Sequence, residues 1–172
     1  QKVVVFDHTR RAGDPRIRAE KKVREPVHLA HSDYTEQSGP QKLHDFLPAQ
    51  EAQERLKRRF SIINVWRSMT GTVESSPIAI CDALSVLPAE LLRIERRARD
   101  RIGEIYGLAH APNQKWYYYP EMREDEALVF KCFDSATDGR ARMSPHTAFT
   151  DSHSPQGAAQ RQSIESRCLV LF

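Results

Sequence analysis

Residues 145–171 read PHTAFTDSHSPQGAAQRQSIESRCLVL, and this stretch decides how the rest of the chain can be arranged. A short apolar run carrying His146 is followed by a polar loop and then by a final run that begins at Arg161. In a strand, alternation with a period of two places Arg161, Ser163 and Arg167 on one face and apolar residues on the other. The stretch therefore predicts two late strands, the second with a polar face.

A second polar signature, His31-Ser32-Asp33, lies far upstream. On a strand, residues i and i+2 point to the same side, so His31 and Asp33 can reach one metal ion. His146 can join them from another strand. Two imidazoles and one carboxylate on one side of a metal leave open positions for a keto acid and dioxygen, which is the ligand set of non-haem iron(II) sites. We therefore expect His31, Asp33 and His146 to bind iron(II).

Arg161, Ser163 and Arg167 are candidates for binding the carboxylate of a 2-oxo acid. The planar fork of an arginine makes two parallel hydrogen bonds to a carboxylate, and a serine hydroxyl can support it. Six residues of strand separate the two arginines by roughly 20 Å, so both are not expected to bind one carboxylate. The loop before Arg161 can bring it beside His146, which favours Arg161 as the anchor, with Arg167 as the alternative.

Each of these short motifs also has a simpler interpretation. His31 and Asp33 could form a surface pair, His146 could be a buried and hydrogen-bonded histidine, and Arg161 could form only an ion pair. The chain has 7 histidines, so a His-x-Asp can also arise by chance. The metal site therefore depends on structural context.

Composition limits the class of protein. With 172 residues, 40% hydrophobic and 28% charged, the chain is typical of one globular domain with a core. A net charge of +3 does not argue for a nucleic-acid partner, and no apolar run approaches a membrane span. Cys81, Cys132 and Cys168 lack any Cys-x-x-Cys spacing, which argues against disulfides and structural zinc and for a reducing, cytoplasmic location.

The pattern of short apolar runs and turns predicts a mainly β fold. Nine strands are expected at Lys2–Asp7, Pro26–Thr35, Phe60–Arg67, Pro77–Val86, Gly103–His110, Lys115–Tyr119, Asp125–Asp134, Ala141–Phe149 and Arg161–Phe172. Gly103–His110 and Lys115–Tyr119 are expected to form a hairpin, and helices are expected at Ala49–Arg59 and Pro88–Asp100. Many short strands with ligands early and late predict a double-stranded β-helix, a jelly roll or cupin-like barrel with a few flanking helices.

Several further residues admit two interpretations. The basic segment Thr9–Arg24 suits a lid or docking loop, although a solvated connector is favoured because charge runs without periodicity rarely pack. His28 is expected to be a core histidine or to support the metal ligands. Trp66 and Asp82 are expected in the core and in an ion pair rather than against substrate. The aromatic run 116–119 could stack on a flat ligand but is more typical of strand packing.

Several longer sequence segments of the chain resemble the AsaB-like fungal hydroxylase/desaturase family. That family includes a gibberellin desaturase and members similar to the cephamycin methoxylation subunit. The segments are INVWRS, IAICDALSV, KWYYYPEM, DEALVFKCFDS, DGRAR, PHTAF and RQSIESR. The resemblance runs from Val3 to Phe172. It departs from the family where Trp66-Arg67-Ser68 replaces Trp-Arg-Pro and in the loop at residues 71–77.

The resemblance implies an iron(II)/2-oxoglutarate oxygenase that tailors a specialised metabolite by hydroxylation or desaturation. His31, Asp33 and His146 match the family's His-x-Asp and Pro-His-Thr words, and Arg161, Ser163 and Arg167 match its Arg-x-Ser and following arginine. Family members extend further at the N-terminus. Because this chain begins at Gln1 inside an expected strand, residues 1–172 are expected to be a single catalytic domain without its natural N-terminal extension.

The expected partners are a small-molecule substrate and dioxygen, without nucleic acid or membrane, and the oligomeric state is left open. Two alternatives remain at this point. One is a catalytically silent jelly-roll module that binds a metabolite or assists a partner enzyme. The other is a metal-dependent isomerase or cyclase on the same scaffold.

Overall fold

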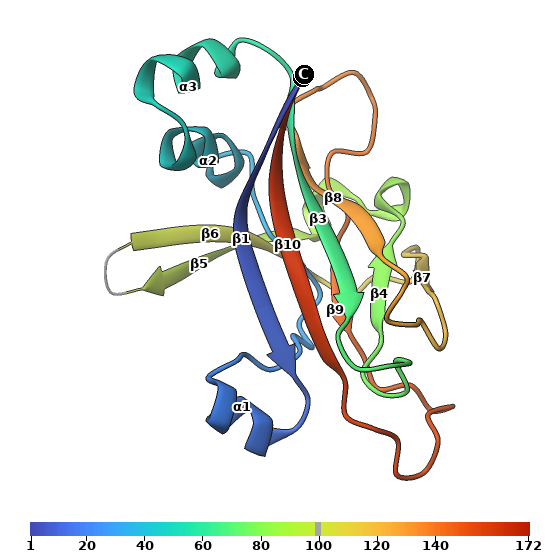
Figure 1. Cartoon of the computed structure of the whole chain (residues 1–172). Coiled ribbons are helices and arrows are strands. Elements are labelled where there is room, and N and C mark those ends of the chain that lie inside the picture. The colour runs from blue at the N-terminus through green and yellow to red at the C-terminus, as the bar shows by residue number, and fades with distance from the viewer. Residues whose placement is uncertain (99–100) are drawn as a thin grey trace.

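The computed structural model describes residues 1–98 and 101–172, which contain two antiparallel sheets (Figure 1). The first sheet has the order β1 (Lys2–Ala12), β10 (Gln162–Leu171), β3 (Phe60–Ser68), β8 (Leu128–Asp134). The second has the order β5 (Leu91–Ala98), β6 (Arg101–Leu108), β2 (His31–Ser32), β9 (His146–Ala148), β4 (Ile78–Cys81), β7 (Trp116–Tyr118). The helices are α1 (Pro15–Lys21), α2 (Ser38–Phe46) and α3 (Ala49–Leu56), with 3-10 turns η1 (Ala83–Ser85) and η2 (Pro88–Glu90).

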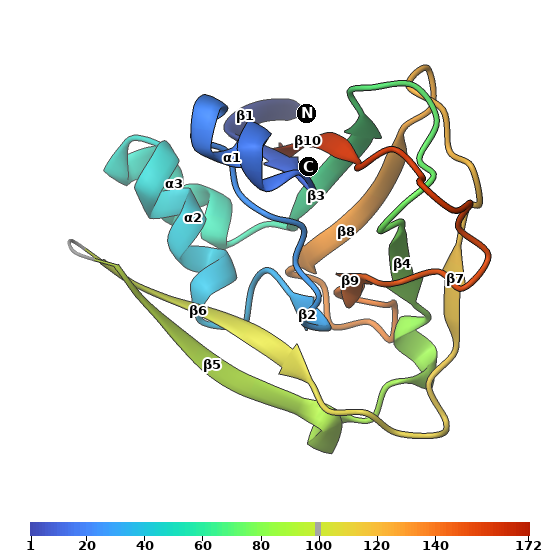
Figure 2. The same cartoon turned by 90° about the horizontal axis from the view of Figure 1, so that it is seen from below.

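The two sheets face each other, so that the short strands β2, β9 and β4 lie opposite β3 and β8 (Figure 2). Helices α2 and α3 lie to one side of this sandwich, near the ends of β1 and β10 that carry the termini (Figure 1). The mainly β architecture with few helices, predicted as a double-stranded β-helix, is confirmed. Its interior is the space between the two sheets, and this is where the candidate ligands lie.

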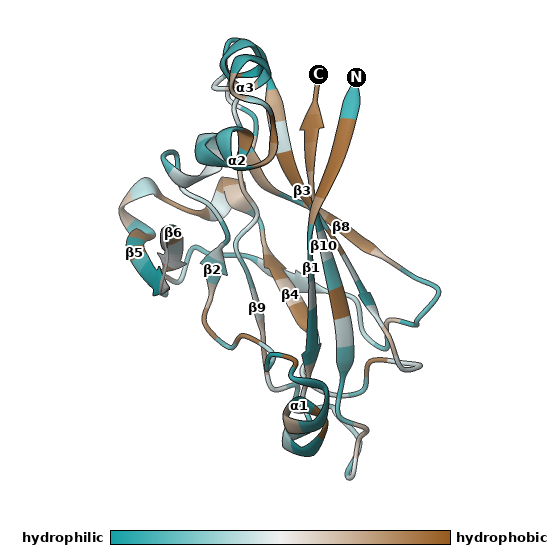
Figure 3. Ribbon diagram, turned by 60° about the vertical axis from the view of Figure 1, so that its left-hand side comes forward, coloured by the Kyte–Doolittle hydropathy of each residue, from teal (hydrophilic) through white to brown (hydrophobic). Residues whose placement is uncertain are grey.

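The inner face of the first sheet changes character along its length. Near the termini it is apolar, and Leu169 and Leu171 of β10 are completely buried there. Farther along the same face of β10, Glu165 and Arg167 are buried polar residues. Figure 3 shows the same change, because β1 and β10 are brown near the termini and largely teal or pale at their other ends. The sheet therefore has an apolar end and a polar end.

Helices α2 and α3 cover the apolar end through Leu43 and Ala52, which belong to the hydrophobic core with Phe133. At Gly39 of α2 a Cβ atom would lie 2.7 Å from the Phe133 ring, so glycine allows the helix to approach the sheet. Phe6 of β1 stacks on Phe46 of α2, with ring centroids 4.7 Å apart. The helices thus close the apolar end and leave the polar end to face the second sheet.

Both edge strands of the first sheet contain a bulge at the boundary between its two ends. On β1 the register shifts between Val5 and Asp7, which leaves Phe6 as the additional residue. On β8 the shift leaves Cys132 as the additional residue opposite the Ile62–Ile63 step of β3. A bulge bends a strand and redirects its side chains, and such irregularities are common beside functional sites. Phe6 and Cys132 are therefore extra inward-facing residues at the same level of the sheet.

The helix predicted at Pro88–Asp100 is wrong where the structure describes it. Residues 88–90 form the turn η2, and Leu91–Ala98 is strand β5, paired along its length with β6. Residues 99–100 lie outside the described part of the chain. The apolar spacing fitted a helix, but the backbone hydrogen bonds supplied by β6 decide the conformation, because strand formation depends strongly on its neighbours.

The predicted hairpin between Gly103–His110 and Lys115–Tyr119 is also wrong. Strand β6 pairs with β5 and β2, whereas β7 pairs with the edge of β4. Periodicity identified both strands but carried no information about their partners. Helix α2 was not predicted, and the other strands were predicted approximately, with Pro26–Thr35 reduced to the two residues of β2.

The segment Thr9–Arg24 is a strand end and a helix instead of a solvated connector. Strand β1 continues to Ala12, and Asp14 begins α1 by accepting a hydrogen bond from the Arg16 amide. Pro15 occupies the first turn, where its missing N–H costs nothing. His28, expected in the core or beside the ligands, is exposed.

The three cysteines are free and buried, in agreement with the expectation from their spacing. Within the described residues, no helix is both long and apolar enough to cross a membrane.

Candidate metal centre

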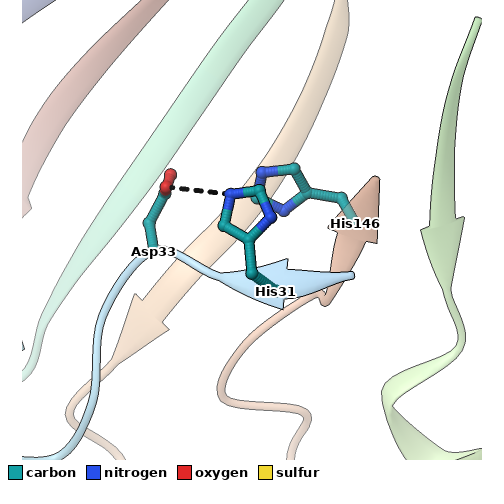
Figure 4. A group of neighbouring side chains, drawn as sticks. All are labelled: His31, Asp33 and His146. Carbon is teal, nitrogen blue, oxygen red and sulfur yellow. Dashed lines mark ion pairs between the residues drawn. The ribbon is translucent and has the colours of Figure 1, made fainter. Parts of the chain in front are cut away.

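His31, Asp33 and His146 converge between the two sheets (Figure 4). His31 of β2 and His146 of β9 are direct cross-strand partners, and their ring centroids lie 4.5 Å apart. Asp33 follows β2 directly and points to the same side as His31, as the spacing predicted. One possible ligand atom from each residue lies within 4.8 Å of the others, so the group could hold a metal ion.

Each imidazole is oriented by a backbone carbonyl. Nδ1 of His31 lies 2.7 Å from the Leu29 carbonyl oxygen, and Nδ1 of His146 lies 3.1 Å from that of Ser144. A carbonyl only accepts, so Nδ1 carries the proton in each ring, and in the neutral form of the imidazole Nε2 then keeps its lone pair. Burial lowers the pKa of His146 to about 4, which keeps this imidazole neutral at neutral pH. Neutral imidazoles with a free Nε2 are suitable metal ligands.

Asp33 is held on the side away from the histidines. Its Oδ2 accepts hydrogen bonds from Arg167 Nε at 2.9 Å and from the Cys132 thiol at 3.3 Å. Its Oδ1 lies 3.6 Å from His31 Nε2, the contact drawn in Figure 4. Burial raises the pKa of Asp33, but the charge of the Arg167 guanidinium outweighs it, and the pKa lies well below its usual range. Asp33 is therefore an ionised carboxylate with one oxygen turned toward the imidazoles.

Arg167 lies at the centre of a buried ion-pair network. Besides Asp33, its guanidinium contacts Asp7 of β1, and its Nη2 lies 3.1 Å from Glu165 Oε1. Glu165 also accepts from Arg11, whose Nη2 is 2.8 Å from Oε1, so two arginines and three carboxylates share the network. Burial lowers the pKa of Arg167, but the facing Asp33 and Glu165 raise it well above its usual value.

Arg161 has a different environment although it lies on the same face. It is 5% exposed, its Nε has no hydrogen-bond partner, and its Nη1 donates to the Ser76 carbonyl oxygen. Its guanidinium carbon lies 5.2 Å from the centroid of the Trp66 ring. Burial, with the nearby Arg11 charge, lowers its pKa to about 10. A buried cation with a free N–H and only a neutral carbonyl as its hydrogen-bond partner is suited to an anionic ligand.

Arg161 shares a cavity with the two candidate histidine ligands. This cavity is lined by Arg11, His31, Trp66, His146, Arg161 and Glu165, together with apolar residues that include Ile78. Trp66 and Ile78 also separate it from a smaller apolar cavity beside Met122 and Leu128. Ser163, the other predicted residue of the anchor, is buried and its hydroxyl has no hydrogen-bond partner.

The structure thus brings the three candidate metal ligands together and places Arg161 in a cavity that two of them line. Sequence reasoning did not anticipate Asp7, Arg11, Cys132 or Glu165. Glu165 could have been found, because it lies on the same alternating face of β10 as Arg161 and Arg167. Asp7, Arg11 and Cys132 lie on bulged strands, where simple alternation does not predict which face a residue occupies.

Residues 1–171 match the family described as an oxidoreductase/YMDC permease-like domain. The chain is 40% identical over 145 residues to the hydroxylase/desaturase asaB of Aspergillus flavus, covering 76% of this chain and 63% of that protein. It is 32% identical over 152 residues to the Fe(II)/2-oxoglutarate-dependent dioxygenase nvfI of Aspergillus novofumigatus, covering 86% of this chain and 53% of that protein. The solved structure of the iron and alpha-ketoglutarate-dependent endoperoxidase NvfI matches with a TM-score of 0.88 and 28% identity, covering 99% of this chain and 62% of that one.

This chain is a mainly β sandwich with a candidate His-Asp-His cluster between its sheets, and its fold matches that of an iron and alpha-ketoglutarate-dependent enzyme. The chain belongs to the AsaB-like fungal hydroxylase/desaturase family. It spans 63% or less of the length of the relatives named above.

Proposed function

We propose that this chain provides the catalytic centre of an iron(II)- and 2-oxoglutarate-dependent oxygenase that hydroxylates or desaturates a small molecule of fungal specialised metabolism. The observation that carries the proposal is a cluster of three candidate metal ligands, two of which line one cavity with a buried arginine whose Nε has no hydrogen-bond partner. The names of the relatives support the same chemistry.

Iron(II) would be held by Nε2 of His31, Nε2 of His146 and a carboxylate oxygen of Asp33. The donor set suits this metal, because it combines two imidazoles and one carboxylate whose possible ligand atoms lie close together. Bound iron supplies dioxygen activation and, with 2-oxoglutarate, the oxidising power for C–H cleavage. The protein's residues fix the ligand orientations and keep bulk water out of a largely buried site.

Arg161 would bind the distal carboxylate of 2-oxoglutarate. Its free Nε and remaining N–H groups can make the paired hydrogen bonds that a carboxylate accepts, and the Ser163 hydroxyl is available on the same strand face. Arg167 is the weaker candidate because its guanidinium already contacts Asp7, Asp33 and Glu165. The proposal therefore assigns the keto acid to Arg161. The substrate would enter the same cavity beside Trp66 and Ile78.

Anaerobic titration of the purified chain with iron(II) and then 2-oxoglutarate tests the proposal. Chelation of iron by the keto acid should produce a metal-to-ligand charge-transfer band, and admission of oxygen should yield succinate. His146→Ala should remove both signals while the domain remains folded, and substitution of the exposed Arg10 on the other face of the sheet serves as the control. If the chain binds iron but forms neither the charge-transfer band nor succinate, the proposed oxygenase activity is contradicted.

The alternative, a catalytically silent module, predicts a folded chain without iron-dependent succinate formation. An isomerase or cyclase predicts turnover of a substrate without its oxidation, which analysis of the product distinguishes.

A further inference from the structure

We propose that Arg167 is a positioning residue, which fixes Asp33 as a one-oxygen ligand and thereby keeps metal positions open. This inference rests on the proposed metal site. It assigns to Arg167 a role that differs from keto-acid binding.

The contacts to Asp33 divide its two oxygens. Oδ2 accepts from Arg167 Nε at 2.9 Å and from Cys132 Sγ at 3.3 Å, so its acceptor capacity is used on the side of the first sheet. Oδ1 receives only a longer bond from Arg167 Nη2, at 3.3 Å, and lies toward His31. The fork-shaped contact prevents the carboxylate from rotating. Oδ1 is therefore the oxygen available to a metal.

Arg167 is itself held in place by groups on both sides. Asp7 contacts its Nη1 from β1, and Glu165 contacts its Nη2 from two residues earlier on β10. Glu165 is in turn held by Arg11 and by Asn64, whose Nδ2 donates to Oε2 at 3.1 Å. A guanidinium with contacts on each nitrogen has little freedom to move, so the orientation of Asp33 is set by the first sheet.

Control of the carboxylate matters because a free aspartate can bind a metal through both oxygens. Two-oxygen binding would occupy a position that a keto acid or dioxygen requires. Residues that orient metal ligands typically contribute 10-fold to 100-fold to metal affinity or activity. The bulges at Phe6 and Cys132 lie at the same level of the sheet, where Asp7 and the Cys132 thiol reach this group.

The chain contains a matched control for this arginine. Arg59 makes the same two-bond contact to a buried carboxylate, with Nε 3.2 Å from Asp134 Oδ1 and Nη2 2.9 Å from Oδ2. That pair is at the apolar end, outside the metal cluster. Loss of either arginine removes the ion-pair partner of a buried carboxylate, although the Arg59 side chain itself is 35% exposed, but only loss of Arg167 should affect a metal.

The test is a cobalt(II) titration of the full chain followed by visible absorption, with thermal unfolding measured in parallel. Arg167→Gln and Arg167→Lys should weaken cobalt binding by about 10-fold to 100-fold. Both should also reduce the intensity of the cobalt bands, because a two-oxygen aspartate raises the coordination number. Arg59→Gln should lower thermal stability and leave the cobalt affinity and spectrum unchanged.

Each outcome is decisive. Unchanged cobalt affinity and spectrum in Arg167→Lys would show that positive charge alone suffices and would overturn the positioning role. If Arg167→Gln does not fold, the lysine variant still provides the comparison. A wild-type chain that binds no cobalt would overturn the proposed metal site as well, whereas wild-type binding with unaffected Arg167 variants would overturn only this inference.

Discussion

The two ends of the first sheet use the same strands for opposite purposes. At the apolar end, Leu169 and Leu171 belong to the same buried hydrophobic core as Leu43 of α2 and Ala52 of α3. At the polar end, Arg161 and Ser163 are equally buried, yet both retain polar atoms without partners. Burial of unpartnered polar groups costs stability. The contrast indicates that the apolar end supports folding, while the polar end is arranged for ligands at some cost to folding.

The largest expected effect belongs to Arg161. Arg161→Gln should weaken 2-oxoglutarate binding by on the order of 100-fold or more, because two charge-assisted hydrogen bonds are lost. Iron affinity should remain almost unchanged, because the substitution alters none of the three candidate metal ligands, while the contacts of Arg161 to the Ser76 carbonyl oxygen and the Trp66 ring are lost. Titration with the keto acid, compared with Arg161→Lys and Arg167→Lys, measures the effect. A defect confined to Arg167→Lys would transfer the anchor to that residue.

The second effect concerns pH in the metal-free protein. Burial lowers the pKa of His146 to about 4, below the value of about 6.5 in an unfolded chain. As the pH falls, the unfolded state therefore binds the proton before the folded state does. The contribution of neutral His146 to the free energy of unfolding is complete above pH 6.5 and is lost as the pH falls toward 4. The loss should reach up to about 3 kcal/mol. Urea unfolding across this range should show a smaller pH slope in His146→Gln, and equal slopes would contradict the assignment.

At the apolar end, a substitution is expected to change stability and not ligand binding. Gly39→Ala should place a methyl group 2.7 Å from the Phe133 ring and force the helix away from the sheet. Overpacking of this kind costs about 1–3 kcal/mol, partly offset by the better helix propensity of alanine. Gly103→Ala is the control, because a Cβ atom there would meet only a backbone oxygen at an ordinary contact distance of 3.8 Å. Chemical unfolding should detect the loss, with metal affinity unchanged. A reduced metal affinity would mean that the two ends are coupled.

The smallest expected effect is on keto-acid affinity, and it is tested with two buried serine hydroxyls that have no hydrogen-bond partner. Ser163→Ala should weaken keto-acid binding by about 1 kcal/mol, a loss of roughly fivefold, if its hydroxyl supports the carboxylate. Ser61→Ala removes the same kind of hydroxyl from the neighbouring strand β3 and should not alter ligand binding. Both changes should be nearly neutral for stability. Equal ligand affinities in the two variants would remove Ser163 from the proposed site.

Much of the fold was predictable because apolar alternation identifies strands wherever they lie. It identified β3, β8 and β10 closely, and the His-x-Asp spacing placed His31 and Asp33 on one side. It failed for β5, whose Leu91, Leu92 and Ile94 fit a helix as well as a strand until β6 provides a partner. Pairing between distant strands is a property of the folded chain, and a local pattern does not encode it.

The placement of the candidate site was predictable where a short motif fixes the geometry, as for His31 and Asp33, while the roles of these residues and of Arg161 stay predictions. It was not predictable where the role depends on a neighbour. Arg161 and Arg167 are chemically identical and share a strand face, yet one lies beside Trp66 and the other among three carboxylates. Only the partners supplied by other strands distinguish them.

The bulge at Phe6 has a consequence for how this family of sequences can change length. Val5 lies opposite Cys168, and Asp7 lies opposite the adjacent Arg167, so the ladder already treats Phe6 as an insertion. Deletion of Phe6 would close the ladder without turning Asp7 or Arg11 to the other face, at the cost of the ring stacked on Phe46. Strand β1 thus contains one residue that is not needed for its register with β10. A single-residue deletion at this bulge would leave the pairing of the residues around Arg167 unchanged.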